Sequence, residues 1–419
     1  MPAKVTNVER FTCIVPMVER IRREMERADI HNWAVTEICR VETDAGVVGW
    51  GETIIHYTWG RVTDDAVKRV IGHPPTEFMW DDSLGAGLQM ALFDAAGKIA
   101  GVPIHRLLGK QTRTLCPASF WDHDMGPEAY EREAKVASDL GYTSMKIKTR
   151  PWHDVYETMR RISEATPEWF KIDCDWNDHL SDVSTAVPVL RELECDFPKI
   201  SIWESPMRMG DASGNRLLRD RIDRAIAHHY GAVPIRTAIE LGVCDGFVIG
   251  GGANRIMSDG NLSAQVHMPF FLQMVGTGLT TTMALHLGAV LTHAEWPMVT
   301  CHELYEHNLL TQRLDVVGGY IRVPEGPGLG VEVDEAALAK YRTKETDIPL
   351  PRQLVCITRP MGVKIWSARS MYSVWPFYKE GNAPRYERGV YTELIDDDGS
   401  KHFDDLWKRS QKWPVVTES

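Results

Sequence analysis

Short strand-like runs alternate with helix-like segments through the middle of the chain, and this alternation limits the fold more than any other feature. The predicted strands are residues 117–121, 144–149, 170–174, 200–204, 225–228, 246–250, 270–275 and 298–301. The segments between them, such as 127–140 and 155–165, have helical periodicity. Eight strand–helix units predict an α/β fold in the form of a modified TIM (β/α) barrel. An open doubly wound sheet is the competing arrangement, but no GxGxxG sequence follows the first predicted strand.

A segment of α+β character precedes the repeat. Residues 34–52 alternate apolar and polar side chains around a break at Asp44-Ala45-Gly46, which predicts a β-hairpin with a glycine-containing turn. Residues 85–108 follow with helical spacing, and Gly101 is typical of a helix end. We therefore expect an N-terminal α+β capping domain over residues 1–115.

The chain changes character again after the repeat, where it becomes rich in proline, aromatic residues and charge. We expect the barrel to span residues 116–335, and residues 336–419 to form a C-terminal extension that packs on the cap, the barrel or a neighbouring subunit. Its tryptophans offer apolar contact area and such barrels commonly assemble, so a homo-oligomer is expected. These tryptophans are Trp366, Trp375, Trp407 and Trp413.

Charge and composition limit the classes of partner. The formal net charge is −11 and there is no long cluster of Lys and Arg, which argues against nucleic acid. No apolar stretch is long enough to cross a membrane, and the first residues lack the apolar core of a signal peptide. The eight cysteines include no CxxC pair, which is typical of reduced thiols. We expect a cytoplasmic protein without nucleic-acid or membrane partners.

Two lysines lie at the end of the second predicted strand. Lys146 and Lys148 are two residues apart, so both side chains face the barrel mouth. Crowded ammonium groups lower each other's pKa, which suits a lysine to act as a base near neutral pH. The alternative is a solvated strand with two ordinary lysines.

Carboxylates end the third and fourth predicted strands. Asp173 and Glu204 each follow an apolar run, and each lies about one βα unit after the preceding candidate. Neighbouring strands bring them together at the barrel mouth, where a hard divalent cation relieves their repulsion. The alternative is that each carboxylate caps the next helix.

This ordered set resembles the enolase superfamily, in its mandelate racemase and muconate lactonizing branch. The resemblance extends over residues 35–335 and includes the glycine pair Gly251-Gly252 after the sixth strand. The other similar stretches are VETDAGVVGWGE at 41–52, ALFDAAGKIAGVPIHRLLG at 91–109, ALHLGA at 284–289 and GPGLGVEVDE at 326–335.

The resemblance implies a mechanism. A Mg²⁺ ion held by three carboxylates binds the substrate carboxylate and stabilises the enediolate that forms when the α-proton leaves. By position, Lys148 is the implied base and Lys146 its electrostatic neighbour. Asp173 and Glu204 are two implied metal ligands, and Glu303 is an acid that hydrogen-bonds the substrate. The residues expected to bind substrate are Asp175, Asn177, His123 and His229.

The third ligand of the family departs from this pattern. Its position falls on His228, with His229 next, instead of on a carboxylate. Imidazole binds divalent ions but is softer than a carboxylate and carries no negative charge. The ion would then be weakly held, be another divalent metal, or be absent. The alternative to a metal ligand is that His228 is a structural histidine held by hydrogen bonds.

The opposite-face acid/base of the racemases is also missing, because the corresponding positions are Gly250 and Gly276. One-base chemistry from Lys148 remains, such as syn elimination of water from an acid sugar, with His123 or His302 protonating the leaving hydroxide. The function expected is a hydro-lyase acting on a small carboxylate.

Two other interpretations stay open: an epimerase or cycloisomerase, and a non-catalytic homologue that serves as a ligand-binding or assembly scaffold. The N-terminal segment 15–30 is the implied substrate-facing loop. Its Arg20, Arg22 and Arg23 could meet an anionic substrate, although a solvated charged helix is the alternative.

Overall fold

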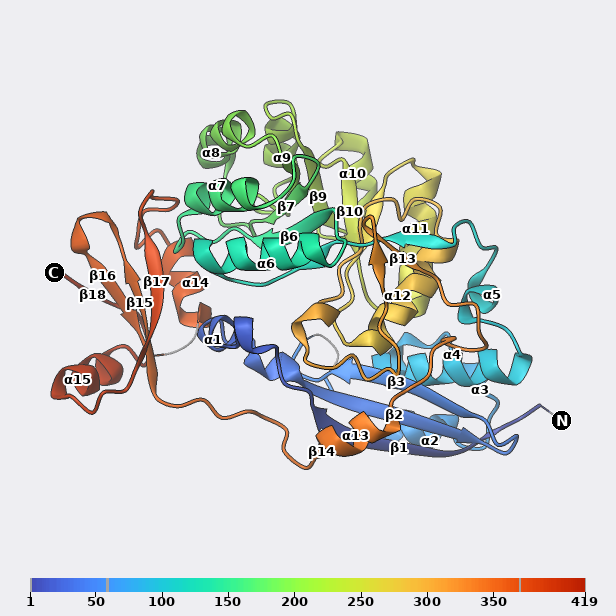
Figure 1. Cartoon of the computed structure of the whole chain (residues 1–419). Helices are drawn as coiled ribbons and strands as arrows, with labels where there is room; N and C mark the ends of the chain where they lie inside the picture. The colour runs from blue at the N-terminus through green and yellow to red at the C-terminus, as the bar shows by residue number, and fades with distance from the viewer. Residues whose placement is uncertain (1, 58–59, 369–370, 419) are drawn as a thin grey trace.

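The protein consists of three packed parts: a cap sheet, a curled parallel sheet wrapped by helices, and a C-terminal sheet (Figure 1). The computed structural model describes residues 2–57, 60–368 and 371–418. Within these residues every helix is too short or too polar to span a bilayer, and the eight cysteines are free thiols, all buried except Cys195.

The cap is built on the predicted hairpin. Its sheet has the order β14-β1-β2-β3, and Gly46 takes a left-handed conformation (φ 73°) in the turn between β2 and β3. Helix α4 lies directly on β3: a Cβ at Gly51 would come 2.1 Å from the carbonyl oxygen of Gly87. The predicted helix is confirmed, and it ends at Gly101 (φ 68°). The cap elements are β1 Val5–Ile14, α1 Glu19–Arg27, β2 Val35–Thr43, β3 Val48–Ile54, α2 Asp64–Val70, α3 Pro75–Phe78, α4 Ala86–Ala100 and α5 Ile104–Leu108.

Seven parallel strands form the curled sheet of the barrel, in the order β11-β10-β9-β8-β7-β6-β5. The eighth predicted strand is reduced to two parallel bridges, Ala118 with Met298 and Gln273 with Val299, which connect the two edges of the sheet. The barrel fold is therefore confirmed. The strands are β5 Phe120–Trp121, β6 Ser144–Lys148, β7 Lys171–Asp175, β8 Ile200–Glu204, β9 Ala225–His229, β10 Gly246–Ile249 and β11 Phe270–Leu272.

The first predicted strand is divided in the structure. Its start belongs to β4 (Leu115–Pro117), which pairs antiparallel with β13 (Tyr320–Arg322), and β13 pairs with β12 (Val316–Val317). Only β5 joins the parallel sheet.

The helices between the strands form the outer layer of the barrel (Figure 1). Helix α12 is buried along nearly its whole length because it also contacts α5 and strand β3 of the cap. The helices are α6 Pro127–Asp139, α7 Val155–Ala165, α8 Val183–Asp196, α9 Ala212–Arg219, α10 Ile235–Leu241, α11 Ala253–Gln265 and α12 Gly278–Val290.

Side chains of the cap accept hydrogen bonds from free backbone N–H groups at the starts of two barrel helices. The buried Glu52 accepts 2.8 Å hydrogen bonds from the backbone N–H groups of Thr277 and Thr280 at the start of α12. Asp82 and Gln89 accept bonds from backbone N–H groups at the start of α11. Free helix N–H groups need such partners when they are buried, so these contacts join cap and barrel tightly.

The C-terminal part contains a four-stranded sheet in the order β17-β15-β16-β18, which lies beside α1 and α6 (Figure 1). Before it, α13 (Glu335–Tyr341) and β14 (Arg342–Thr343) return to the cap, where β14 pairs with β1. The elements of the C-terminal sheet are β15 Gln353–Thr358, β16 Lys364–Ser367, α14 Met371–Lys379, β17 Tyr391–Asp396, α15 Lys401–Arg409 and β18 Val415–Thr417.

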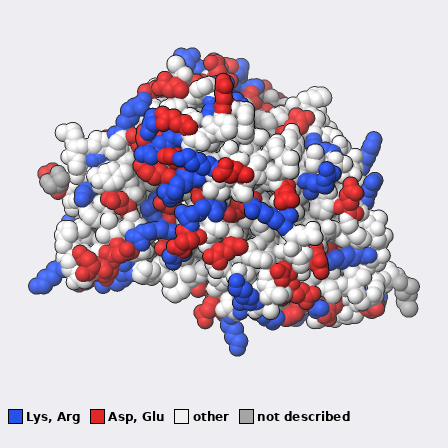
Figure 2. Space-filling view, viewed as in Figure 1, with Lys and Arg blue, Asp and Glu red and all other residues white. Residues whose placement is uncertain are grey.

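Acidic and basic side chains are intermingled on the face that Figure 2 shows. On α6 and α7 they form ion pairs, for example those of Arg160 with Glu157 and of Arg161 with Glu131. Such exposed pairs contribute little to stability individually, because water screens the attraction between the two charges.

Candidate active site

The carboxyl ends of β6, β7 and β8 bring the charged candidates together. Lys148 is the register partner of Asp175, and Asp175 is the register partner of Glu204. Since alternate residues of a strand face the same side, Lys146 and Asp173 point into the barrel from one step deeper.

Lys146 is the centre of an ion cluster at this end of the sheet. Its Nζ lies 2.5 Å from Oε2 of Glu204 and 3.5 Å from Oδ2 of Asp175, and it donates a 2.6 Å hydrogen bond to Oε1 of Gln273. Burial opposes its charge, but Glu204 and the two aspartates raise the pKa of Lys146 above that of an ordinary lysine. Lys146 is therefore a fixed cation and a poor base.

Lys148 has the opposite electrostatic character. It forms an ion pair with Asp175 and donates a 3.2 Å hydrogen bond to Oδ1 of Asn177. Burial lowers the pKa of Lys148 below that of an ordinary lysine, and Lys146 and Arg150 act in the same direction against the attraction of Asp175. Of the two lysines, Lys148 is the one suited to accept a proton.

The two aspartates of β7, Asp173 and Asp175, differ in their partners. Burial opposes ionisation of Asp175, but Lys148 and Lys146 hold its pKa well below the usual range. Burial and the nearby Glu204 raise the pKa of Asp173 well above it. Asp175, predicted only as a substrate contact, shares Lys146 with Glu204 and lies nearer the mouth, so it is the better metal ligand of the two.

The histidine pair at the end of β9 also requires a correction of one residue. His228 faces outward: its Nε2 lies 3.0 Å from Oδ1 of Asn215 on α9, and burial lowers its pKa to about 4. His229 faces the cluster, with its Nε2 3.4 Å from Oε1 of Glu204. Strand β9 continues to His229, one residue further than predicted. Neighbouring residues of a strand face opposite sides, so His229 faces the site and His228 faces away from it.

The set that comes closest to a metal site is Asp175, Glu204 and His229. In the described ranges of the chain, no three His, Cys, Asp or Glu side chains are already arranged to hold an ion. However, Oε1 of Glu204 and Oδ1 of Asp173 are buried acceptors without a hydrogen-bond partner in those ranges. Buried carboxylate oxygens that lack a donor suit a hard divalent cation such as Mg²⁺, whereas an imidazole in the same set favours a transition metal.

Glu303 and His302 do not belong to this cluster, contrary to prediction. Both lie in a 3-10 turn (His302–Leu304), where Nε2 of His302 lies 3.3 Å from Oε1 of Glu303. Glu303 also accepts hydrogen bonds from Arg313 (2.8 Å) and Tyr142 (3.2 Å). Burial opposes ionisation, but His302 and Arg313 lower the pKa of Glu303 to about 2. These partners hold the two side chains in an ion-pair network of their own.

Aromatic rings that the sequence did not single out form the wall beside the lysines. The centroid of the Trp121 ring lies 4.9 Å from Nζ of Lys146 and 5.6 Å from Nζ of Lys148. Trp33 of the cap packs against Trp121 and against His123. Burial, together with Lys148 and Arg150, holds the pKa of His123 well below its usual value. A neutral, buried His123 is a poor source of a proton for a leaving group.

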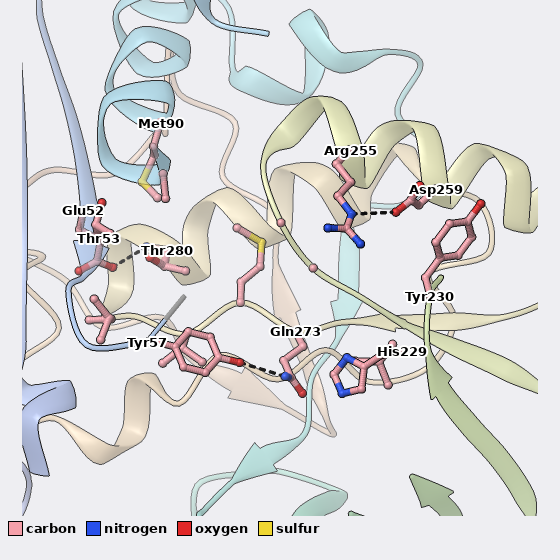
Figure 3. Close-up of a pocket in the computed structure, with 17 residues that line it drawn as sticks. Glu52, Thr53, Tyr57, Met90, His229, Tyr230, Arg255, Asp259, Gln273 and Thr280 are labelled. Carbon is pink, nitrogen blue, oxygen red and sulfur yellow. Dashed lines mark hydrogen bonds and ion pairs between the residues drawn. The ribbon is translucent and has the colours of Figure 1, made fainter. Parts of the chain in front are cut away.

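A cavity of about 430 Å³ opens next to the cluster, between the cap and the ends of β9, β10 and β11 (Figure 3). Gln273 connects the two regions: it accepts from Lys146 and donates a 3.0 Å hydrogen bond to the hydroxyl of Tyr57. The lining includes Glu52, Thr53, Ile54, Tyr57, Met90, His229, Tyr230, Gly250, Gly251, Arg255, Asp259, Gln273, Met274, Val275 and Thr280. The arginines predicted from segment 15–30 are not part of it. That segment forms α1, and Arg20 and Arg23 pair with Glu133 and Asp396.

Comparisons with known proteins give the chain a family model and several relatives. The family model described as "Enolase C-terminal domain-like" matches residues 129–337. The chain is 27% identical to the o-succinylbenzoate synthase of Bacillus subtilis over 331 residues, which are 72% of this chain and 87% of that protein. It is 22% identical to the arabinonate dehydratase of Saccharolobus solfataricus over 341 residues, which are 73% of this chain and 90% of that protein.

The fold also has close counterparts among solved structures. A mandelate racemase/muconate lactonizing family protein from Azoarcus sp. EbN1 superposes with a TM-score of 0.66 at 23% identity. The superposition covers 81% of this chain and 97% of the other. At this identity the match shows that the two chains share a fold.

Proposed function

Because the chain belongs to the enolase superfamily, in its mandelate racemase and muconate lactonizing branch, we propose that it is a lyase acting on a hydroxy-carboxylate. It abstracts the proton α to the carboxylate and eliminates water, with an acid sugar or a small hydroxy acid as substrate. The observation that carries the proposal is the buried cluster at the ends of β6, β7 and β8. In this cluster Nζ of Lys146 lies 2.5 Å from Oε2 of Glu204, and Lys148 pairs with Asp175 one step nearer the mouth.

The first step is a proton transfer to Lys148. Nζ of neutral Lys148 accepts the α-proton, and the electrons left behind form an enediolate on the substrate carboxylate. Lys146 contributes a fixed positive charge beside it, which is worth most in a site from which water is excluded. A divalent cation held by Asp175, Glu204 and His229 would supply further positive charge for the carboxylate.

Elimination then needs a proton for the departing hydroxide. Lys148, now an ammonium group, lies on the same face and can return the proton it has taken, so that the hydroxide leaves as water. Gly250 carries no side chain on the opposite face, and Gly276 carries none at the end of β11. A syn elimination with one residue as base and then acid therefore suits this site better than a two-base racemisation.

The experiment is ²H exchange at the α-carbon across a library of acid sugars, followed by NMR in ²H₂O with Mg²⁺ or with a chelator. We expect one or more acids to exchange and to lose water, and the metal content of the protein to rise with added Mg²⁺. If no acid exchanges or loses water under either condition, the proposal fails and the scaffold interpretation replaces it.

A further inference from the structure

A fully buried arginine lies between the barrel mouth and the C-terminal part of the chain. Arg150 follows Lys148 by two residues and is 1% exposed. Its guanidinium carbon lies 4.4 Å from the ring centroid of Trp375, on α14, and 5.8 Å from that of Trp152. The extension thus covers one side of the mouth with an aromatic ring.

The guanidinium group has unused hydrogen-bonding capacity. None of its three nitrogens has a hydrogen-bond partner among the described residues. Its nearest carboxylate is Asp124, whose Oδ2 lies 3.5 Å from Nε. Asp124 already accepts hydrogen bonds from Arg27, Trp152 and His153, so its charge is shared. An arginine buried in this way is costly unless an anion completes it.

Other polar groups around Arg150 lack partners as well. Both ring nitrogens of the buried His179 are without a hydrogen bond in the described ranges, and its ring packs against Trp152 (5.3 Å) and Trp375 (5.0 Å). The buried hydroxyl of Tyr386 is equally unpartnered there. Burial, Arg150 and Lys379 hold the pKa of His179 well below its usual range, so that this ring is a neutral donor.

We propose that Arg150, with His179 and Trp375, forms an anion subsite that the C-terminal extension adds to the mouth. It binds the second anionic group of the substrate. This inference rests on the proposed function and narrows its substrate class to hydroxy acids that are charged at both ends, such as dicarboxylates. Lys148 is the last residue of β6, and Arg150 follows two residues later, just beyond the strand. The base and the proposed subsite are therefore neighbours along the chain, which suits a short-chain acid that reaches from one to the other.

The arrangement also gives the extension a role. The superposition on the Azoarcus structure covers 97% of that chain but only 81% of this one. This chain therefore has residues that have no counterpart in that structure. Trp375 comes from the C-terminal part, and it holds the guanidinium plane by stacking while leaving the N–H groups at its edge available.

The test compares acids that differ only at the far end. Glucarate and gluconate differ by a carboxylate in place of a hydroxymethyl group, as do tartrate and threonate, and 6-phosphogluconate provides a phosphate instead. We expect calorimetric dissociation constants of the full-length protein with Mg²⁺ to favour at least one doubly charged acid about tenfold or more. A preference for 6-phosphogluconate alone assigns the subsite to phosphate, and equal binding within every pair overturns the proposal.

Variants separate an anion subsite from a merely structural arginine. Arg150→Met should remove the preference while changing the binding of the singly charged acid less than about twofold. Arg388→Met is the matched control, since Arg388 also stacks on a barrel ring, 3.8 Å from the centroid of Tyr156, but pairs with Glu192. It should keep the preference, and a preference that persists in Arg150→Met contradicts the proposal.

A second variant covers the case in which Arg150→Met does not fold. Arg150→Lys keeps the charge but loses the forked geometry, and it should reduce the preference about threefold or more. The proposed function has a separate readout. Binding of the doubly charged acids without α-proton exchange and without loss of water refutes the lyase, whereas either reaction without any preference refutes only the subsite.

Discussion

The two sides of the barrel mouth are built from opposite kinds of residue. On the side of β6, β7 and β8 the strands end in Lys148, Asp175 and Glu204, which are buried and ion-paired. On the side of β10 and β11 the chain presents Gly250, Gly251, Met274 and Val275 to an open cavity. The charged side can therefore take up and return protons, and the open side can hold the substrate. The difference indicates chemistry on one face of the substrate.

The largest effect is expected from the base itself. Lys148→Ala should reduce α-proton exchange about 10³-fold, because it removes the amine that accepts the proton in the proposed step. ¹H NMR in ²H₂O measures the rate. Lys171→Ala, at the exposed start of β7, is the control and should exchange at the rate of the unaltered protein. Unchanged exchange in Lys148→Ala would refute the one-sided mechanism.

Removing a carboxylate from the charged side should mainly cost stability. Glu204→Ala leaves the buried ammonium of Lys146 without its 2.5 Å partner, and we expect a loss of about 3–5 kcal/mol in the free energy of unfolding. Urea titration followed by circular dichroism measures it. Glu204→Gln retains the shape and a hydrogen-bond acceptor and should lose less. A loss below 1 kcal/mol in Glu204→Ala would show that the pair is solvated.

The register of the two histidines gives a third test. His229→Ala should weaken Mn²⁺ binding about tenfold, because the imidazole that faces Glu204 is lost. His228→Ala should leave Mn²⁺ affinity unchanged and destabilise the fold by about 1–3 kcal/mol, since Asn215 loses its buried partner. Calorimetry and thermal unfolding separate the two results. The reverse pattern would restore the ligand predicted from sequence.

The pH dependence tests how Lys146 influences Lys148. Exchange should rise with pH as Lys148 loses its proton, and the rise should be complete below the pKa of an ordinary lysine. Lys146→Met removes a neighbouring positive charge, and Asp175 then forms its ion pair with Lys148 and no longer with Lys146. Both changes raise the pKa of Lys148 and should move the rise to higher pH. A profile that does not move would mean that Lys146 does not influence the pKa of Lys148.

The smallest effect is expected on the open side. Arg255→Ala breaks a 3.4 Å pair with Asp259 at the rim of the cavity, where Arg255 is exposed (Figure 3). We expect less than about 1 kcal/mol in stability and less than threefold in exchange rate. A tenfold loss of exchange would show that this side also contacts the reacting part of the substrate.

Sequence patterns were sufficient for the barrel because each strand is a short apolar run that ends in a chemically distinctive residue. The hairpin turn at Gly46 and the helix end at Gly101 were predicted for the same local reason, since each needs a left-handed backbone. The lysine pair also follows from local alternation. Two residues of one strand always share a face.

The errors arose where the outcome depended on one residue of register or on distant partners. His228 and His229 exchange roles when β9 ends one residue later, and Asp173 and Asp175 share a face but differ in depth. The ion pair of Glu303 with Arg313 requires a loop that no periodicity describes. Likewise, the sheet of β15–β18 was not predicted from a sequence dominated by turns and aromatic residues.

The cap residues that complete the starts of α11 and α12 have a consequence for folding. In a barrel without the cap, the N–H groups at the starts of α11 and α12 would lose the Asp82 and Glu52 carboxylates that accept from them. In an isolated cap, the two carboxylates would lose these donors. Neither part is then an autonomous folding unit, and cap and barrel should melt in one cooperative transition.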